Sequence, residues 1–417
     1  MATRIQESTP LWKKMLDWVD ARFPLTSTMR DHVTEYYAPK NFNFWYYFGS
    51  LALLMLVLQI GTGIFLTMHY KPDAERAFGS VEYIMRDVPW GWLIRYLHAV
   101  GASFFFAVIY LHIFRGLLYG SFRRPRELVW LVGMLIFGVL MGEAFMGYLL
   151  PWGQMSYWGA QVITSLFGAI PWVGERLLEW IRGDYVVSDA TLNRFFSMHV
   201  ILFPLILLGL VGAHLLALHE SGSNNPDGIE IKDHLDPNTG HPVDGIPFHP
   251  YYTVKDIVGV VVFLMVYLGV VFFWPEGGGK LLEKDNFFPA DTMTTPAHIA
   301  PLWYFTPFYA ILRAIPDKLM GVAGMGGAIV LFFLLPWLDQ GRVKSIRYRG
   351  PLFKFMLLLF VVSFLSLGYL GLQPVTPTYT LLARIFALVY FSFFLLMPIY
   401  TRLDRAMEKP LPQRVRA

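Results

Sequence analysis

The chain has 417 residues, of which 55% are hydrophobic and only 15% are charged, and its formal net charge is +4. This balance excludes a soluble globular protein, because long apolar segments with so little charge are typical of membrane proteins. The chain contains no cysteine. It therefore cannot itself hold a covalently attached c-type haem, a thiolate-bound iron–sulfur cluster or a thiolate zinc site.

The apolar runs predict an all-α integral membrane protein with eight transmembrane helices. The segment before the first helix is polar and amphipathic around Trp12–Val19, so we expect no cleavable signal there. We expect two parts, an N-terminal four-helix bundle in residues 1–220 and a C-terminal four-helix region in residues 221–417. The predicted helices lie near residues 44–68, 91–118, 129–149, 192–218, 254–274, 319–337, 352–372 and 380–401.

The distribution of positive charge predicts how these helices cross the membrane. An even number of helices places both termini on one side, and the segments on that side carry 20 Lys and Arg residues against nine on the other. The positive-inside rule therefore predicts that both termini are cytoplasmic. The second and fourth helices then both run from the outer face to the inner face.

These two parallel helices each carry a pair of histidines. His98 and His112 are 14 residues apart, and His199 and His214 are 15 apart. Each pair spans roughly 21–22 Å and stays on one helix face. Because neutral imidazole is a common iron ligand, His98 with His199 at the outer depth and His112 with His214 at the inner depth predict two stacked haem sites. Pro204 cannot donate a helix hydrogen bond, so we expect a local distortion near it that absorbs the extra residue.

Four glycines recur in step with the histidines. Gly49 and Gly63 on the first helix, and Gly133 and Gly147 on the third, are also 14 residues apart. A macrocycle lying flat against a helix needs a position without a side chain, which only glycine provides. The alternative is that small residues simply aid helix packing in the membrane. Their register with the histidines favours haem.

Two arginines lie near the predicted haem sites. Arg95 precedes His98 by three residues, and Arg115 follows His112 by three. Arginine can pair with a haem propionate through bidentate hydrogen bonds, whereas the alternative is that both side chains snorkel to the interface. Ser121 is a weaker candidate for contact with the inner haem.

Several long segments resemble one family. "RYLHAVGASFFF", "GYLLPWGQMSYWGA", "HLLALHESGSNNP" and "PFYAILRAIPDK" occur in the order found in cytochrome b, the core subunit of the ubiquinol–cytochrome c oxidoreductase (the cytochrome bc complex), here of bacterial type. The resemblance implies two non-covalent b-type haems that link two quinone sites. It also implies two partner subunits, a Rieske-type iron–sulfur protein and a c-type cytochrome, in a homodimer of the complex. The expected location is the bacterial inner membrane, in contact with membrane lipid and with no nucleic-acid partner.

The resemblance places the quinol-oxidising site at the outer face. The residues that it implies for the lining of this site are Phe145, Tyr148, Met155, Gly159, Pro301, Trp303 and Tyr304. The family's usual motif here is Pro-Glu-Trp-Tyr, whose carboxylate is thought to accept a quinol proton. This chain has Leu302 at the position of the glutamate, and leucine cannot transfer a proton.

Glu143 is a candidate substitute for that carboxylate. It lies within the apolar third helix, two residues before Phe145, where an unpaired carboxylate is costly. We expect it to accept the quinol proton at the outer site. The alternative is a structural carboxylate that is hydrogen-bonded to a neighbouring helix.

The quinone-reducing site is implied at the inner, cytoplasmic face. His219 and Asp256 lie where they could deliver protons to reduced quinone, and Ser223, Lys255 and Asn43 are supporting candidates. In isolation, each would be an ordinary polar residue of the interface.

These features together predict a quinol-oxidising enzyme. Electrons would pass from quinol at the outer face through two haems to quinone at the cytoplasmic face, coupled to proton translocation. One alternative is a polytopic transporter with an intramembrane histidine proton relay, but it does not explain the glycine register. A dihaem membrane anchor for a dehydrogenase is another, and the four helices after residue 253 argue against it.

Overall fold

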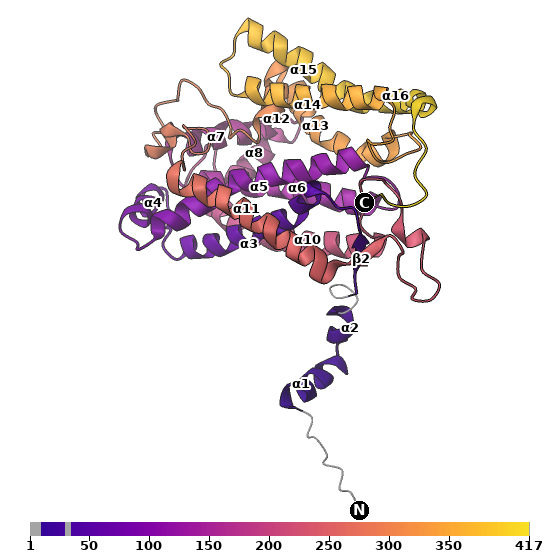
Figure 1. Ribbon diagram of the computed structural model, residues 1–417. Coiled ribbons are helices and arrows are strands. Elements are labelled where there is room, and N and C mark those ends of the chain that lie inside the picture. Colours follow the sequence, from indigo (N-terminus) through magenta and orange to yellow (C-terminus); the bar gives the residue numbers. More distant parts are fainter. Residues whose placement is uncertain (1–9, 30–34, 417) are drawn as a thin grey trace, which may run out of the picture.

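The computed structural model describes residues 10–29 and 35–416, so the two chain ends predicted to be cytoplasmic lie outside it. Eight helices in this part of the chain are long and apolar enough to cross a membrane, which confirms the predicted all-α membrane fold (Figure 1). They span Phe44–Thr67, Gly91–Tyr119, Glu127–Leu149, Asp189–Ser221, Phe248–Phe273, Lys318–Leu338, Pro351–Gly371 and Pro377–Leu395.

The eighth helix ends earlier than predicted, at Leu395 rather than near residue 401. Pro398 has no amide hydrogen to donate, and its ring obstructs the carbonyl one turn before it. A separate helix, α16 (Met397–Asp404), therefore begins directly after α15 (Pro377–Leu395). Hydropathy alone cannot detect this break, because the apolar run continues through residues 396–400.

The N-terminal bundle consists of two packed helix pairs. Helix α5 (Gly91–Tyr119) packs along α3 (Tyr47–Thr67), and α6 (Glu127–Leu149) packs along α10 (Phe203–Ser221). Helix α11 (Thr253–Phe273) lies against both α3 and α5. The histidines of the second and fourth spans therefore come from different pairs of the bundle.

The fourth span contains the distortion that the sequence predicts. Helix α9 (Asp189–Ser197) continues through a π-helical turn, η4 (Met198–Leu202), into α10, which has Pro204 in its first turn. A π-turn holds one more residue than an α-turn. It therefore absorbs the additional residue of this helix, and both histidine pairs keep a similar facing.

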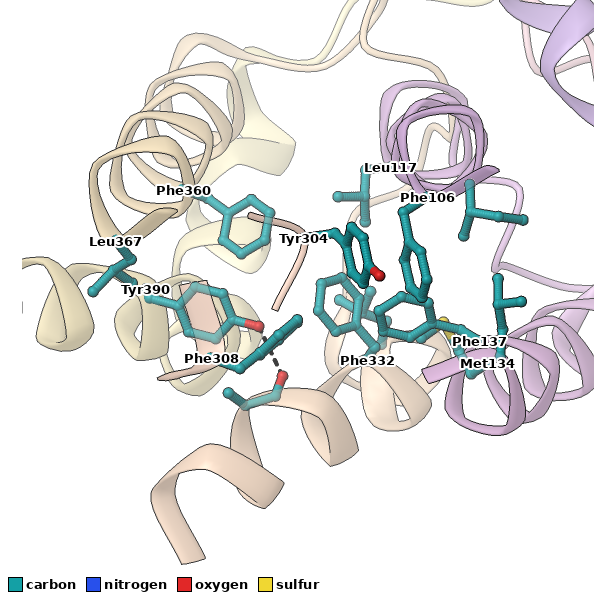
Figure 2. Packing of buried hydrophobic residues seen from close by; sticks show 14 of the residues in the cluster. Phe106, Leu117, Met134, Phe137, Tyr304, Phe308, Phe332, Phe360, Leu367 and Tyr390 are labelled. Carbon is teal, nitrogen blue, oxygen red and sulfur yellow. Dashed lines mark hydrogen bonds between the residues drawn. The ribbon is translucent and has the colours of Figure 1, made fainter. Parts of the chain in front are cut away.

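The C-terminal region packs around a short helix. Helix α12 (Thr306–Ala314) contacts α13 (Lys318–Leu338), α14 (Pro351–Gly371) and α15. An aromatic cluster joins this region to the bundle (Figure 2). In it, the rings of Phe106 and Tyr304 stack with centroids 4.1 Å apart, and the Tyr390 hydroxyl donates to the carbonyl of Ala328 at 2.7 Å. The segment that contains Leu302 and Tyr304 is thereby held against α5.

Short elements cover both ends of the spans. On the predicted outer face, residues 284–290 dock on the start of α7, where Gln154 N donates to Phe288 O and Ala290 N donates to Trp152 O, both at 3.0 Å. The other elements of this face are α4 (Ala77–Arg86), α7 (Gln154–Ser165), η3 (Phe167–Ala169), α8 (Gly174–Arg182) and η7 (Lys284–Phe287).

At the opposite, predicted inner end, strands β1 (Tyr37–Pro39) and β2 (Gly245–Pro247) pair antiparallel, with Ala38 opposite Ile246. This end also includes η2 (Phe44–Tyr46), η5 (Ile231–Asp233), η6 (Phe248–Tyr252) and η8 (Arg405–Met407). In the described N-terminal arm, α1 (Leu11–Asp20) and α2 (Leu25–Met29) extend away from the bundle (Figure 1).

Candidate functional site

The four histidines form two facing pairs inside the bundle. The ring centres of His98 and His199 are 6.1 Å apart, and those of His112 and His214 are 6.3 Å apart. An imidazole nitrogen binds a transition metal at about 2.0 Å and lies about 1.1 Å from its ring centre, so a metal held by two rings places their centres about 6 Å apart. Both pairs have this spacing, and they are the pairs predicted from topology.

The four glycines leave room for the histidine rings themselves. A Cβ added at Gly63 would lie 3.2 Å from Cε1 of His98, and one added at Gly147 would overlap the ring of His199. The inner pair is arranged in the same way, with Gly49 against His112 and Gly133 against His214. An added side chain would press on the facing imidazole at Gly63 and Gly133, and would overlap it at Gly147.

The outer histidines have hydrogen-bond partners on Nδ1. Thr62 Oγ1 lies 2.9 Å from Nδ1 of His98, and both the carbonyl oxygen and Oε1 of Glu143 lie 3.0 Å from Nδ1 of His199. A histidine that binds metal through Nε2 usually donates Nδ1–H to such an acceptor, which fixes the ring orientation. Thr62 was not predicted from the sequence, where its position beside Gly63 in an apolar helix is the only signal for it.

The arginines suit the propionates of haem. Arg115 donates through Nη1 to Ser121 Oγ at 3.3 Å, while its Nε is buried without a partner, and no carboxylate among the described residues pairs with it. A buried guanidinium without an anion is unfavourable, so a haem propionate would complete its surroundings. Arg95 lines the cavity beside the outer histidines. Ring spacing, glycine positions and this unpaired cation all fit haem.

A cavity of about 530 Å³ adjoins the outer histidine pair. His98, His199 and Glu143 contribute to its lining, and so do Tyr148 and Tyr304 from the predicted quinol site. Such a volume is typical of cofactor and ligand sites. Leu302, which stands at the position of the motif glutamate, also lines this cavity.

The other residues implied for the outer quinol site do not line this cavity. Phe145 packs on Phe195 with ring centres 5.6 Å apart, and Trp303 donates to Ser103 Oγ at 3.1 Å. A Cβ on Gly159 would lie 3.7 Å from the Tyr148 ring. Met155 is buried and Pro301 is partly buried.

One polar residue of the cavity was missed from the sequence. Glu283 lines it, and its carboxylate accepts a hydrogen bond from the Tyr148 hydroxyl. These two residues are 135 positions apart, so no local pattern joins them. The only sequence signal is a single carboxylate directly after two leucines in an outer loop.

The residues predicted for the inner quinone site gather around the segment that leads into α3. The His219 ring stacks on Tyr36 with centroids 4.5 Å apart, and Ser223 Oγ lies 2.7 Å from the Tyr36 hydroxyl. Asn43 donates to the Tyr119 hydroxyl at 2.8 Å. Lys255 donates to the carbonyl of residue 42 at 2.9 Å, and Asp256 lies in the first turn of α11, which packs on α3.

Comparison with known proteins identifies the family. Residues 33–222 match the family model described as Cytochrome b/b6/petB, and residues 289–391 match that described as Cytochrome b(C-terminal)/b6/petD. A cytochrome b of Allochromatium vinosum is 62% identical over 407 residues, which cover 96% of this chain and 98% of that protein. The chain belongs to the cytochrome b family. Haem and quinone binding follow from this membership.

Other cytochromes b match over similar lengths. The protein of Rickettsia bellii is 50% identical over 413 residues and 99% of both chains, and that of Arabidopsis thaliana is 48% identical over 92% of this chain and 94% of its own. A solved structure titled "Hyperthermophilic respiratory Complex III" has a TM-score of 0.85 and 42% identity, covering 94% of this chain and all of the matched one.

Proposed function

We propose that this cytochrome b takes electrons from quinol at its outer face and passes them across the membrane to quinone at the cytoplasmic face. The observation that carries the proposal is the stacking of two histidine pairs in one bundle, with a cavity beside the outer pair. Each pair would hold one non-covalent b-type haem, which supplies one-electron transfer when bound. Proton release outside and uptake inside would couple this flow to proton translocation.

We further infer that the chain works within a quinol–cytochrome c oxidoreductase. The solved Complex III chain at 42% identity supports this inference. Because this chain has no cysteine, the iron–sulfur centre and any covalently attached haem must belong to partners. We propose a Rieske-type protein and a c-type cytochrome as these partners, in a homodimeric complex in the bacterial inner membrane, with both termini cytoplasmic.

We assign the remaining polar residues to the haem propionates and to the inner quinone site. We assign Arg95, Arg115 and Ser121 to the haem propionates, where charge-assisted hydrogen bonds are strongest. At the inner site, His219 and Asp256 would supply protons to reduced quinone. The residues that would orient quinone there are Asn43, Ser223 and Lys255. Membership of the cytochrome b family argues against the alternative of a proton-relay transporter.

The proposal is tested with the purified complex. We expect quinol to reduce cytochrome c in a saturable manner, and quinol to reduce b-type haem in the same preparation. A haem-loaded complex that does not oxidise quinol would contradict the proposal.

The contact of Glu143 with His199 predicts how a substitution would change the midpoint potential of the outer haem. Replacing it by glutamine weakens the acceptor on His199 Nδ1, because an amide oxygen accepts less strongly than a carboxylate, and the imidazole becomes less basic. Oxidised iron is then less stabilised, so the midpoint potential of the outer haem should rise. A tenfold change in this balance is about 59 mV for a one-electron couple, and we expect a shift on the order of that size.

A redox titration of the Glu143→Gln complex measures this shift. An unchanged potential together with a large loss of quinol oxidation would instead support the role predicted from sequence, in which Glu143 accepts the quinol proton.

A further inference from the structure

Among the described residues, three carboxylates line the outer cavity, and each has a different partner. Glu82, at the exposed rim, pairs with Arg86 at 3.2 Å. Glu143 places Oε1 3.0 Å from His199 Nδ1. Glu283 accepts a hydrogen bond from the Tyr148 hydroxyl. The first is neutralised by an arginine, and the second holds a haem ligand through Oε1. Among the described residues, the third is paired with neither a cation nor a histidine, so it is the strongest candidate for a base toward a substrate.

We propose that Glu283 is a catalytic residue of the outer site and accepts one hydroxyl proton of quinol, with the Tyr148 hydroxyl holding its carboxylate in place. This inference rests on the proposed function and deepens it. It supplies the proton acceptor that Leu302, on the same cavity wall, cannot provide.

One hydrogen-bond network fixes both members of this pair. Ser156 N donates to Asn286 Oδ1 at 2.9 Å, and Asn286 Nδ2 donates to Ser156 Oγ at 3.0 Å. The Ser156 hydroxyl in turn donates to the carbonyl of Tyr148 at 2.5 Å. Glu283 is the N-cap residue of the turn that contains Asn286. The loop carboxylate is therefore docked onto the end of α6, as a positioned base requires.

The charge environment suits proton acceptance near neutral pH. Burial raises the pKa of Glu283 to about 8, and the nearby negative charge of Asp285 adds to this effect. The other ionisable groups that face it are the hydroxyls of Tyr148 and Tyr304, and Lys284 follows it in the chain. A general base works best when its pKa is close to the working pH.

The proton transfer is balanced within the proposed reaction. One quinol O–H bond breaks, and an O–H bond forms on the Glu283 carboxylate. The second hydroxyl proton is released to the outer aqueous phase. Of the two electrons, one passes to the iron–sulfur centre of the proposed Rieske-type partner, and the other crosses the membrane through the two haem sites. Lys284 and Asp285 are exposed, so protonated Glu283 is adjacent to solvent and can release its proton outward.

The test compares Glu283→Gln with the purified wild-type complex. General base catalysis contributes roughly 10²–10⁴-fold, so we expect quinol-dependent cytochrome c reduction to fall at least about 100-fold while both haem signals stay unchanged. In the wild type, the rate should rise with pH through about 8, because the carboxylate becomes ionised. This rise should be absent in the variant. Glu276→Gln, an exposed carboxylate of the same loop, is the matched control and should behave as wild type.

Two further variants test the proposal even if the glutamine at position 283 disturbs the loop. Glu283→Asp retains a carboxylate and should keep the pH-dependent rise at a reduced rate. Tyr148→Phe removes a hydrogen bond to the ionised carboxylate, so the rise should move to higher pH. A Glu283→Gln complex with wild-type rate and pH profile, or an unmoved profile in Tyr148→Phe, would overturn this proposal alone. A wild-type complex that does not oxidise quinol would overturn it together with the proposed function.

Discussion

Replacing His112 by leucine should remove one of two b-type haems and abolish electron transfer through the bundle. The imidazole faces that of His214 with ring centres 6.3 Å apart, and leucine has no atom that binds iron. The outer pair lies 14 residues away along α5, roughly 21 Å, so its haem should remain. We expect haem content to fall from two to one per chain, and quinol-dependent cytochrome c reduction to fall by more than about 100-fold.

Extracted haem per chain and the redox-titrated spectrum measure this outcome. His234→Leu is a suitable control, because His234 lies exposed in the 222–247 loop, and it should retain both signals. Two intact haems in His112→Leu would show that this residue is not a ligand.

The second large effect is expected for Gly147→Val. An added Cβ there would overlap the ring of His199, whose Nδ1 is held by Glu143, so the ring would have to leave its present position. The valine should therefore displace the ligand and remove the outer haem signal, while the inner signal persists. Gly138→Val on the same helix is a matched control, because an added Cβ at Gly138 meets no atom within 4 Å.

Visible spectra of the two glycine variants show whether valine acts through the clash with His199 or by disturbing α6 in general. We predict that Gly147→Val loses the outer haem signal and that Gly138→Val keeps it. Equal loss in both variants would mean that valine disturbs α6 generally, and retention in both would remove the reason for glycine at position 147.

The sequence predicts the membrane spans well because lipid imposes a simple requirement. Each span needs about 20 apolar residues with internally satisfied backbone, so hydropathy locates the spans to within a few residues. The parallel orientation of the second and fourth spans then pairs His98 with His199. Pro204 also indicates the π-turn at Met198–Leu202, since a missing amide hydrogen is visible in the sequence.

Contacts between distant loops are less accessible to sequence reasoning. The pairing of Tyr148 with Glu283 depends on how residues 284–290 dock on α7, and no periodicity encodes that docking. The contact of Glu143 with His199 is similar, because it depends on the facing of α6 toward η4. The glycine register predicts which positions must lack a side chain, but only the three-dimensional structure shows that each one faces an imidazole.

We propose that the four histidines hold two haems in one electron path. A redox-titrated visible spectrum of the purified, detergent-solubilised protein tests it most directly. We predict two b-type signals with separable midpoint potentials, and complete extraction of both haems by acid acetone because the chain has no cysteine to bind them. A protein without haem, or with a single b-type signal, would contradict the account.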